Sequence, residues 1–326
     1  MRFFDSAATR DALPFDRLIA ALRERFALGC EVPLRHSHTL ASGPDGTLSS
    51  LIMPAWVPGR CYGVKTVNIA TGNARFGLPG LHSTYLLYDA VTGAPLAWMD
   101  GDQITARRTA AASALAASWL ARADARHLLV VGAGQVARLL PEAYRAVRPI
   151  ERITVWARNA AQASALAADW RQRGWDAHAA TSLQAAAGAA DIVSCATLAT
   201  QPVLMGAWLS PGSHLDLIGS FTPAMREADD DCFAGAALYI DTDEALAKSG
   251  ELLGPMSRGV FAASDVQGTL AQLARGEARG RSSATQRTVF KSVGTALEDL
   301  AAAMLVVDTL PGDGRPAVHA DGGVLR

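Results

Sequence analysis

The pattern of apolar and polar residues changes near residue 126 of this chain. Before that point one amphipathic helix is expected over 14–28, and a long alanine-rich helix is expected over 104–121. Between the two helices lie short extended runs that are broken by glycine and proline. These runs are 31–40, 48–54, 62–70, 83–88 and 94–99. This succession predicts a small sheet in an α+β region.

From residue 126 onward, apolar strands alternate with helices. The expected strands are 127–131, 152–157, 177–180, 191–196, 214–219 and 237–241, and the expected helices between the first four are 135–147, 160–173 and 182–187. Strands that alternate with helices of this length build a parallel sheet with right-handed crossovers. A last helix is expected over about 284–307, followed by a glycine- and proline-rich tail over 311–326.

A glycine motif lies at the start of this alternating region. The apolar run 128–131 leads directly into a Gly-x-Gly-x-x-Ala turn, Gly132 to Ala137. Gly132 permits the tight turn, Gly134 lets the backbone approach a pyrophosphate, and Ala137 lets the helix pack closely on the strand. An ordinary glycine-rich turn is the alternative, but the strand before it and the helix after it favour dinucleotide binding. The residues expected to bind the cofactor here are Gly132, Gly134, Gln135 and Val136.

The end of the second strand indicates which nicotinamide cofactor is bound. An acidic residue at this position would favour NADH, but this chain has Arg158 followed by Asn159. A guanidinium can pair with a 2′-phosphate, so NADPH is favoured and NADH stays possible. The alternative is a solvated Arg158 before a helix that Asn159 caps. Thr197 and Gly219 follow later strands, where contact with the cofactor is also expected.

The composition excludes several classes of protein. The chain has 326 residues, a length that suggests two domains, and its formal net charge of −1 gives no attraction to nucleic acid. Neither a signal peptide nor a membrane span is evident. His36 and His38 find no third ligand at a useful spacing, so no metal is expected. The four cysteines are far apart, which indicates a reducing compartment and a cytoplasmic protein: Cys30, Cys61, Cys195 and Cys232.

Cationic residues of the first half are candidates for substrate binding. Lys65 lies inside an apolar extended run, where a lysine is either on a solvated face or functional. Arg108 shares a helix face with Ile104, and that face is expected to be buried. A buried arginine needs an anion, either a substrate carboxylate or the partner of a structural salt bridge. Arg35 is a weaker candidate, and His82 is a candidate proton donor.

Several short segments of this chain occur in the same order as in the ornithine cyclodeaminase/mu-crystallin family. The chain resembles that family over about residues 1 to 308. The resemblance implies a homodimer, and a Rossmann domain (121–299) inserted into an α+β substrate and dimerisation domain (1–120, completed by about 300–326). The segments are Lys65 with Val67-Asn68, Gly77 to Gly80, Asp100-Gly101, Ile104 to Ala106, Arg108 to Ala111, Gly132 to Gly134, and Phe290 to Gly294.

The resemblance also implies roles for individual residues. Lys65 and Arg108 match the family's substrate-binding lysine and arginine, and Arg35 matches an arginine that also grips the substrate carboxylate. The resemblance places Val293 near the nicotinamide, and Arg108 is also expected to contact the cofactor.

One departure from the family pattern concerns the sub-function. Ornithine cyclodeaminases have an acidic residue after the fifth Rossmann strand, where this chain has Phe221. Phenylalanine cannot act as a base or pair with an ammonium group. The turn therefore looks more like that of the reductase branch, which implies NAD(P)H-dependent reduction of Δ1-pyrroline-2-carboxylate or Δ1-piperideine-2-carboxylate to L-proline or L-pipecolate. Ornithine cyclodeaminase, alanine dehydrogenase and a mu-crystallin-like binding protein remain as alternatives.

Overall fold

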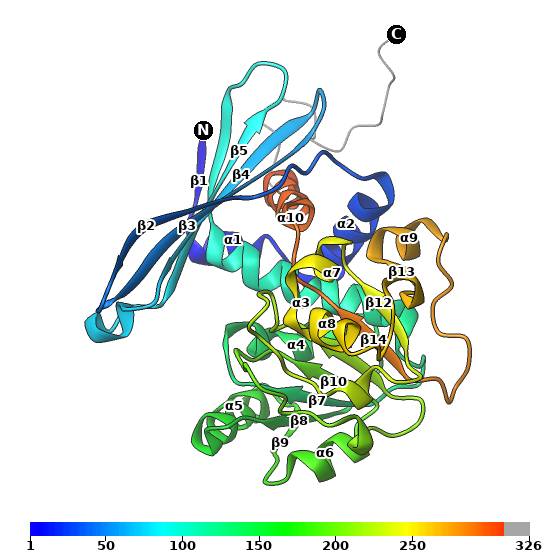
Figure 1. The fold of residues 1–326 in the computed structure, drawn as a ribbon. Coiled ribbons are helices and arrows are strands. Elements are labelled where there is room, and N and C mark those ends of the chain that lie inside the picture. Colours follow the sequence, from blue (N-terminus) through cyan, green and yellow to red (C-terminus); the bar gives the residue numbers. More distant parts are fainter. Residues whose placement is uncertain (310–326) are drawn as a thin grey trace. The chain divides into compact units, whose positions relative to one another are not determined.

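The computed structural model describes residues 1–309, which divide into two compact units. Of the described residues, unit 1 comprises Met1–Arg108 together with 295–309, and unit 2 comprises Thr109–Gly294. Unit 2 is therefore an insertion in the sequence of unit 1. In Figure 1 unit 1 is coloured blue and cyan, with its last helix in orange-red, while unit 2 runs from cyan-green to orange. The tail expected over 311–326 lies outside the described residues.

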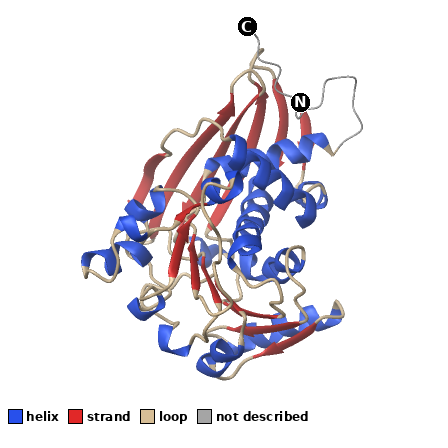
Figure 2. Ribbon diagram, turned by 90° about the vertical axis from the view of Figure 1, so that its right-hand side faces the viewer, coloured by secondary structure: helices blue, strands red, loops and turns tan. Residues whose placement is uncertain are grey.

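Unit 1 contains a six-stranded sheet with helices packed on it. The strand order is β1-β6-β5-β4-β3-β2, and all neighbours are antiparallel except β1 and β6. Helix α10 packs against α2 and against β3, β4 and β5, and Figure 2 shows helices beside the long strands. The strands are β1 (Arg2–Phe4), β2 (His36–Gly43), β3 (Gly46–Val57), β4 (Cys61–Ala70), β5 (Leu81–Asp89) and β6 (Pro95–Asp100). The helices are α1 (Ser6–Asp11), α2 (Phe15–Leu28), α10 (Ala296–Asp308) and the short η1 (Asn73–Phe76); α3 (Gly101–Leu120) begins in this unit.

The two faces of this sheet differ in burial. Residues that pair across antiparallel strands point to the same face. The row Met53, Lys65, Tyr85 and Met99 is buried, and none of these residues is more than 6% exposed. The next row points to the other face and stays partly exposed. It consists of Pro54, Val64, Leu86 and Trp98.

Unit 2 contains an eight-stranded parallel sheet. The strand order is β13-β12-β14-β11-β10-β7-β8-β9. The strands are β7 (His127–Val131), β8 (Arg152–Trp156), β9 (Asp176–Ala179), β10 (Ile192–Cys195), β11 (His214–Leu217), β12 (Ala237–Ile240), β13 (Gly268–Thr269) and β14 (Thr288–Lys291). The helices are α4 (Gln135–Arg145), α5 (Ala160–Gln172), α6 (Leu183–Ala189), α7 (Glu244–Lys248), α8 (Gly250–Ser257) and α9 (Leu270–Arg275), with short turns η2 (Gly206–Trp208), η3 (Asp230–Cys232) and η4 (Ala263–Asp265). Every residue of the strands β10, β11, β12 and β14 is buried, as expected when both faces of a parallel sheet are covered.

The sequence predicted most of these elements to within a few residues, with one clear error near the end. The helix expected over 284–307 is in fact the strand β14 followed by a loop and then α10. Gly294 has a φ of +77°, which breaks the chain before α10 begins. A buried strand of four residues has no period that distinguishes it from helix, so periodicity failed here. The strands β1 and β13 and the helices α1, α7, α8 and α9 were not predicted.

Within the described residues, no helix combines the length and the apolar character that crossing a membrane requires. Over the same residues, histidine, cysteine and acidic side chains form no group of three or more that could hold a metal ion.

Candidate functional site

The glycine turn after β7 has the geometry of a phosphate-binding turn. Gly132 has a φ of +119°, and a Cβ at this position would lie 2.5 Å from the carbonyl oxygen of Ala196. Gly134 precedes the first residue of α4, and no side chain caps this helix. A Cβ at Gly134 would meet no atom within 4 Å. The backbone N–H groups of Gln135 and Val136 therefore lie in the first turn of a helix whose N-terminus has no side-chain cap. Together with the positive end of the helix dipole, these N–H groups are suited to bind a pyrophosphate.

The strand order puts this turn at the switch point of the sheet. Strand β7 pairs with β8 on one side and with β10 on the other, so successive connections leave the centre in opposite directions. Ligands of such sheets bind outside the carboxyl ends of the strands at this point. The close approach of Gly132 to Ala196 occurs at that edge. The structure thus brings the predicted turn to the place where a dinucleotide binds in this type of sheet.

Arg158 and Asn159 follow β8, and both are exposed. The Asn159 side chain caps α5, since its oxygen accepts hydrogen bonds from the N–H groups of Ala161 (3.0 Å) and Gln162 (3.4 Å). The capping role that the sequence left open for Asn159 is therefore present. Arg158 is the residue before this N-cap, and because it is exposed it is open to a ligand.

Buried carboxylates hold the loops that carry the other predicted cofactor residues. Glu227 accepts hydrogen bonds from the N–H groups of Thr197 (2.7 Å) and Gly219 (2.6 Å). Asp241 accepts hydrogen bonds from the N–H groups of Val293 and Gly294, both at 2.7 Å. The loops after β10, β11 and β14 are thus anchored at the carboxyl edge of the sheet. Sequence reasoning missed both carboxylates, because Glu227 and Asp241 belong to no recognisable motif.

A second cluster of charged side chains lies in unit 1, where Lys65 and Arg108 meet two acidic residues of α10. Lys65 Nζ is 2.6 Å from Asp299 Oδ2 and donates a hydrogen bond to Thr105 Oγ1 at 3.3 Å. Arg108 Nε is 2.8 Å from Asp299 Oδ1, and its Nη1 is 2.5 Å from Glu298 Oε2. Asp299 therefore bridges the two cations through its two oxygens.

The charges of this cluster balance. Two cations face two carboxylates, and all four side chains are buried. Burial and the nearby positive charge of Arg108 lower the pKa of Lys65 to about 8, although Asp299 opposes this change. Burial by itself would raise the pKa of Asp299, but Lys65 and Arg108 bring it below the usual value.

The structure corrects one step of the sequence argument. Arg108 is buried on the same helix as Ile104, as expected. However, its charge does not depend on a substrate for compensation, because Glu298 and Asp299 supply two carboxylates. The structural ion pair that the sequence left open is therefore present, and any role of Arg108 toward a ligand is additional to it.

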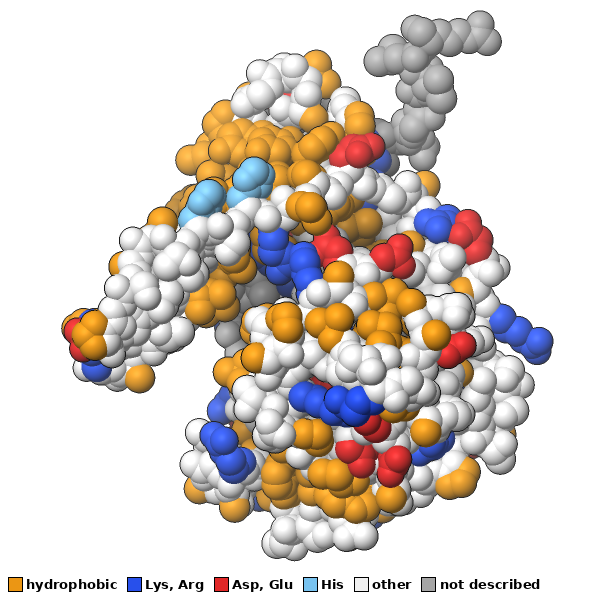
Figure 3. Space-filling model, in the orientation of Figure 1, with side chains coloured by type: hydrophobic (Ala, Val, Ile, Leu, Met, Phe, Trp, Pro, Cys, Tyr) orange, Lys and Arg blue, Asp and Glu red, His pale blue; other side chains and the backbone are white. Residues whose placement is uncertain are grey.

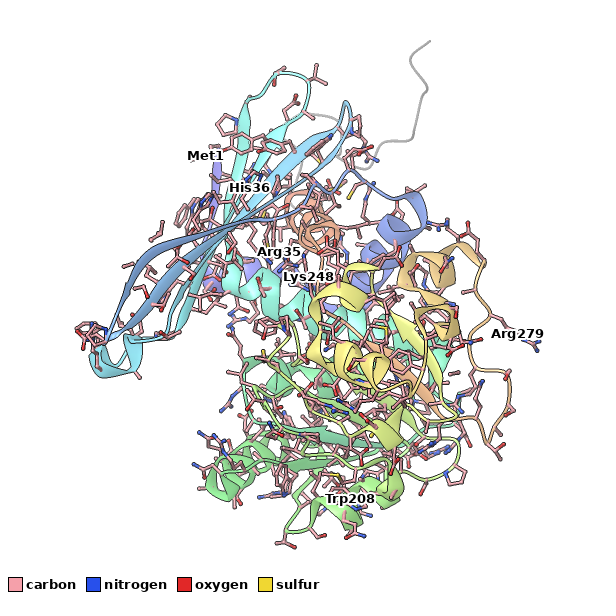
Figure 4. The ribbon with its side chains drawn as sticks, in the orientation of Figure 1. Met1, Arg35, His36, Trp208, Lys248 and Arg279 are labelled. Carbon is pink, nitrogen blue, oxygen red and sulfur yellow. The ribbon has the colours of Figure 1, made fainter. Side chains whose placement is uncertain are left out.

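Arg35 and His82 have different relations to Lys65. Arg35 immediately precedes β2, as Figure 4 shows. His36 is the first residue of β2, and it pairs with Ile52 of β3. The next residue of β3, Met53, pairs with Lys65 of β4. Arg35 thus enters the sheet about two strand spacings, or roughly 10 Å, from the Lys65 backbone.

His82 lies on the other face of the sheet. It pairs with Asn68, whereas Lys65 pairs with Tyr85, three residues away along β5. Side chains an odd number of residues apart on a regular strand point to opposite faces. His82 is also exposed, so within this chain the structure does not bring it together with Lys65.

A parallel sheet in this order, with a glycine turn at its switch point, defines a dinucleotide-binding domain. The comparison with family models goes further, since the model of the ornithine cyclodeaminase/mu-crystallin family matches residues 15–313. The chain belongs to that family.

Three similar proteins indicate which members of the family this chain is most usefully compared with. A Δ1-pyrroline-2-carboxylate reductase of Paracoccus denitrificans is 45% identical over 290 residues, which cover 86% of this chain and 91% of that protein. The structure of a Δ1-pyrroline-2-carboxylate reductase of Thermococcus litoralis, in complex with NADH and L-proline, has a TM-score of 0.88 at 32% identity and covers 94% of this chain and 96% of that one. The structure of an archaeal alanine dehydrogenase dimer with bound NAD has a TM-score of 0.86 at 28% identity, with 94% and 95% covered.

Proposed function

We propose that this protein is an oxidoreductase that reduces a cyclic α-imino acid with a reduced nicotinamide cofactor. Its substrates are Δ1-pyrroline-2-carboxylate, Δ1-piperideine-2-carboxylate or both, and its products are L-proline or L-pipecolate. The observation that carries this proposal is the buried pair of cations, Lys65 and Arg108, which Asp299 bridges in a chain similar to reductases of these substrates.

The charge balance of the cluster suits such a substrate. A cyclic α-imino acid carries a carboxylate, and its nitrogen becomes positive when protonated. The protonated form is therefore a neutral zwitterion, and its binding leaves the formally neutral cluster neutral. Lys65 and Arg108 are the groups that we assign to the carboxylate, together with Arg35. Asp299 and Glu298 are the negative charges available to a protonated nitrogen.

Reduction of the C=N bond needs a hydride at carbon and a proton at nitrogen. The reduced nicotinamide, when bound, supplies the hydride. A substrate that binds in its protonated form already carries this proton. For an imine that binds in its neutral form, we assign the proton donor to Lys65 Nζ, because Lys65 has a pKa of about 8 and is mostly protonated at neutral pH. Thr105 and Asp299 hold that Nζ in place. We assign the proton to Lys65 rather than to His82, the candidate from the sequence, because His82 lies on the other face of the sheet from Lys65.

We assign cofactor binding to unit 2. Gly132, Gly134, Gln135 and Val136 form the pyrophosphate turn, and Thr197, Gly219 and Val293 lie in the anchored loops. Arg158 favours NADPH, because its exposed guanidinium follows β8 where an acidic residue would favour NADH. The similar structures contain NADH or NAD, so both reduced cofactors belong in the test.

Phe221 argues against an ornithine cyclodeaminase. It is 42% exposed, in the turn after β11 where those enzymes have an acidic residue. An apolar ring cannot accept a proton, but it can contact the methylene groups of a cyclic substrate. Reduction of an imine that is already cyclic needs no base at this position.

We also propose that two copies of the chain associate through the exposed face of the unit 1 sheet. Phe3 stacks on Trp98 with ring centroids 4.4 Å apart, and Tyr62 stacks on Tyr88 at 5.5 Å. Figure 3 shows hydrophobic side chains gathered over β4 and β5 in the upper part of the view. A similar structure is an alanine dehydrogenase dimer. An exposed aromatic face of this kind is typical of a protein interface.

The reaction can be tested directly by the loss of absorbance of the reduced cofactor. The purified protein is mixed with NADPH or NADH and with each of the two imino acids, and the products are identified. We expect oxidation of the cofactor and formation of proline or pipecolate. Incubation with pyruvate, ammonia and the reduced cofactor tests for alanine dehydrogenase activity. Incubation with ornithine, without a reduced cofactor, tests for ornithine cyclodeaminase activity. Cofactor binding without turnover of any substrate would support a binding protein instead.

A further inference from the structure

The carboxylate of Glu227 joins two loops at the edge of the unit 2 sheet. Its Oε1 accepts hydrogen bonds from the N–H group (2.7 Å) and the Oγ1 hydroxyl (2.8 Å) of Thr197, just after β10. Its Oε2 accepts a hydrogen bond from the N–H group of Gly219 at 2.6 Å, just after β11. Glu227 itself is fully buried. One side chain therefore fixes the backbone of two successive loops.

These two loops are in direct contact at Gly219. A Cβ at Gly219 would lie 2.0 Å from the carbonyl oxygen of Thr197 and 2.5 Å from Glu227 Oε1. No side chain fits into this space, so the two loops and the carboxylate form one packed unit. A change at Glu227 must therefore shift both loops together.

A second buried carboxylate, that of Glu251, fixes the backbone at Glu227. Glu251 is fully buried, and it accepts hydrogen bonds from the N–H groups of Glu227 (2.8 Å) and Ala228 (2.9 Å). The segment that carries Glu227 is thereby fixed through its backbone.

The positive charge that offsets these carboxylates comes from Lys291, at the end of β14. It is fully buried and donates a hydrogen bond to the carbonyl oxygen of Leu217 at 2.9 Å. Its charge lowers the pKa values of Glu227 and Glu251, which burial would otherwise raise further. A buried carboxylate is costly unless it is hydrogen-bonded and its charge is compensated. The N–H and hydroxyl donors supply the hydrogen bonds, and Lys291 supplies a buried positive charge that favours the ionised form of both acids.

We infer that Glu227 is a positioning residue for the nicotinamide cofactor, because it sets the conformation of the loops that carry Thr197 and Gly219. The three donors that converge on it all require an acceptor. A carboxylate can accept from all of them, whereas the amide of a glutamine has one oxygen and turns two N–H donors toward its neighbours. The identity of the ligand rests on the proposed function, but the anchoring of the two loops does not.

The test replaces Glu227 by glutamine and measures the loops and the cofactor separately. Amide hydrogen exchange of the free protein reports on the loops at Thr197 and Gly219, and fluorescence titration gives the Kd of NADPH and NADH without substrate. In the Glu227→Gln variant we expect faster exchange in both loops and a Kd that is roughly 10- to 100-fold higher. The KM for the imino acid at saturating cofactor should change less than twofold, because Lys65 and Arg108 are untouched.

A matched control is Asp216→Asn, which also changes a buried carboxylate of the same sheet into an amide. Asp216 accepts hydrogen bonds only from hydroxyl groups in the contacts known for it, those of Ser113, Tyr144 and Ser194. The Kd of the Asp216→Asn variant for the cofactor should stay within twofold of the wild-type value. An equal loss of cofactor affinity in both variants would show a general effect of the lost charge and would overturn the inference.

Folding and function are controlled separately. If Glu227→Gln does not fold, Glu227→Asp keeps the charge but shortens the side chain, and the same rise in Kd and exchange is expected. Unchanged exchange and unchanged Kd in a folded variant would refute the positioning role. A wild-type protein that binds the cofactor but reduces no imino acid would refute the proposed function and leave this inference standing.

Discussion

Lys65 Nζ lies 2.6 Å from Asp299 Oδ2, and Asp299 Oδ1 lies 2.8 Å from Arg108 Nε. One buried carboxylate therefore orients both cations that we assign to the substrate. Breaking a buried ion pair by removing one partner leaves the other charge without compensation, which is strongly unfavourable. Asp299 thus determines how readily Lys65 keeps its proton.

The first prediction is that Asp299→Asn shifts the alkaline limb of the pH profile to lower pH. Asp299 raises the pKa of Lys65, while burial and Arg108 lower it to about 8. Without the carboxylate the pKa falls further, and Lys65 is protonated only at lower pH. At neutral pH, kcat/KM should fall about 100-fold, the effect of losing one charged contact. The measurement is kcat/KM against pH.

Glu298→Gln is the control for this prediction. Glu298 contacts Arg108 at 2.5 Å, and its charge raises the pKa of Lys65 less than the charge of Asp299 does. The alkaline limb of the pH profile should therefore shift much less in Glu298→Gln than in Asp299→Asn. If the two variants shift the limb equally, or if neither does, Asp299 does not govern the proton of Lys65.

The sequence predicted the nucleotide turn well because its determinants are local. The apolar run 128–131, the glycines and the helix that follows lie within one short segment, and the structure has them as expected. The charge cluster could not be predicted in the same way, since Arg108 and Asp299 are 191 residues apart. Acidic residues at the start of α10 are explained equally well by the helix dipole.

Glu227 was also beyond sequence reasoning. It lies in an acidic stretch that reads as a solvated loop, Arg226 to Asp231. Only the folded sheet brings it to Thr197 and Gly219. The error over 284–307 has a similar origin, because the four residues of β14 become a strand through their parallel neighbours β11 and β12.

The second prediction concerns the choice of cofactor. Replacing Arg158 by alanine should lower the ratio of kcat/KM for NADPH to that for NADH about 10- to 100-fold, because a charged hydrogen bond to the 2′-phosphate is lost. The control is Arg152→Ala, which changes an exposed arginine at the opposite end of β8. Steady-state kinetics with both cofactors measure the ratio. An unchanged ratio in Arg158→Ala would show that Arg158 does not read the 2′-phosphate.

The third prediction compares two glycines of the cofactor edge. Gly219→Ala should destabilise the protein by about 2–4 kcal/mol, because overpacking against backbone forces the loops apart. The added Cβ would lie 2.0 Å from the Thr197 oxygen. Gly134→Ala should leave the stability within about 1 kcal/mol, since its Cβ meets nothing within 4 Å. Both should weaken cofactor binding, the first by moving the loops and the second by crowding the pyrophosphate.

Thermal unfolding without cofactor and a cofactor titration separate the two effects in this pair. Equal stability of the two variants would contradict the packing that the structure shows at Gly219. Unaltered cofactor affinity in Gly134→Ala would contradict the assignment of the pyrophosphate to this turn.

The fourth prediction concerns association. Val64→Glu puts a charge on the exposed face of the unit 1 sheet, in the row of Pro54 and Leu86. We expect a dimeric wild type and a monomeric variant, because an unpaired charge in an apolar interface is costly. Leu28→Glu, at the end of α2, changes an exposed leucine outside this face and should remain dimeric. Light scattering after size exclusion gives the mass, and a wild-type monomer would refute the proposed interface.

The last prediction concerns the pH dependence of stability, and it follows from Asp216. Burial raises the pKa of Asp216 to about 6, although hydrogen bonds from Ser194, Tyr144 and Ser113 oppose this. An acid whose pKa is higher in the folded than in the unfolded state stabilises the fold when protonated, and this contribution is lost as the pH rises through the folded pKa. Its contribution is present below about pH 4 and lost by about pH 6, and a shift of this size is worth about 3 kcal/mol.

In Asp216→Asn this ionisation is absent, and the three hydroxyl groups can rotate to donate to or accept from the amide. We therefore expect the variant to gain stability relative to the wild type as the pH rises from 4 to 8. Denaturant unfolding at several pH values gives the difference in free energy of unfolding. A difference that does not change with pH would show that Asp216 ionises in the folded protein as readily as it does in the unfolded chain.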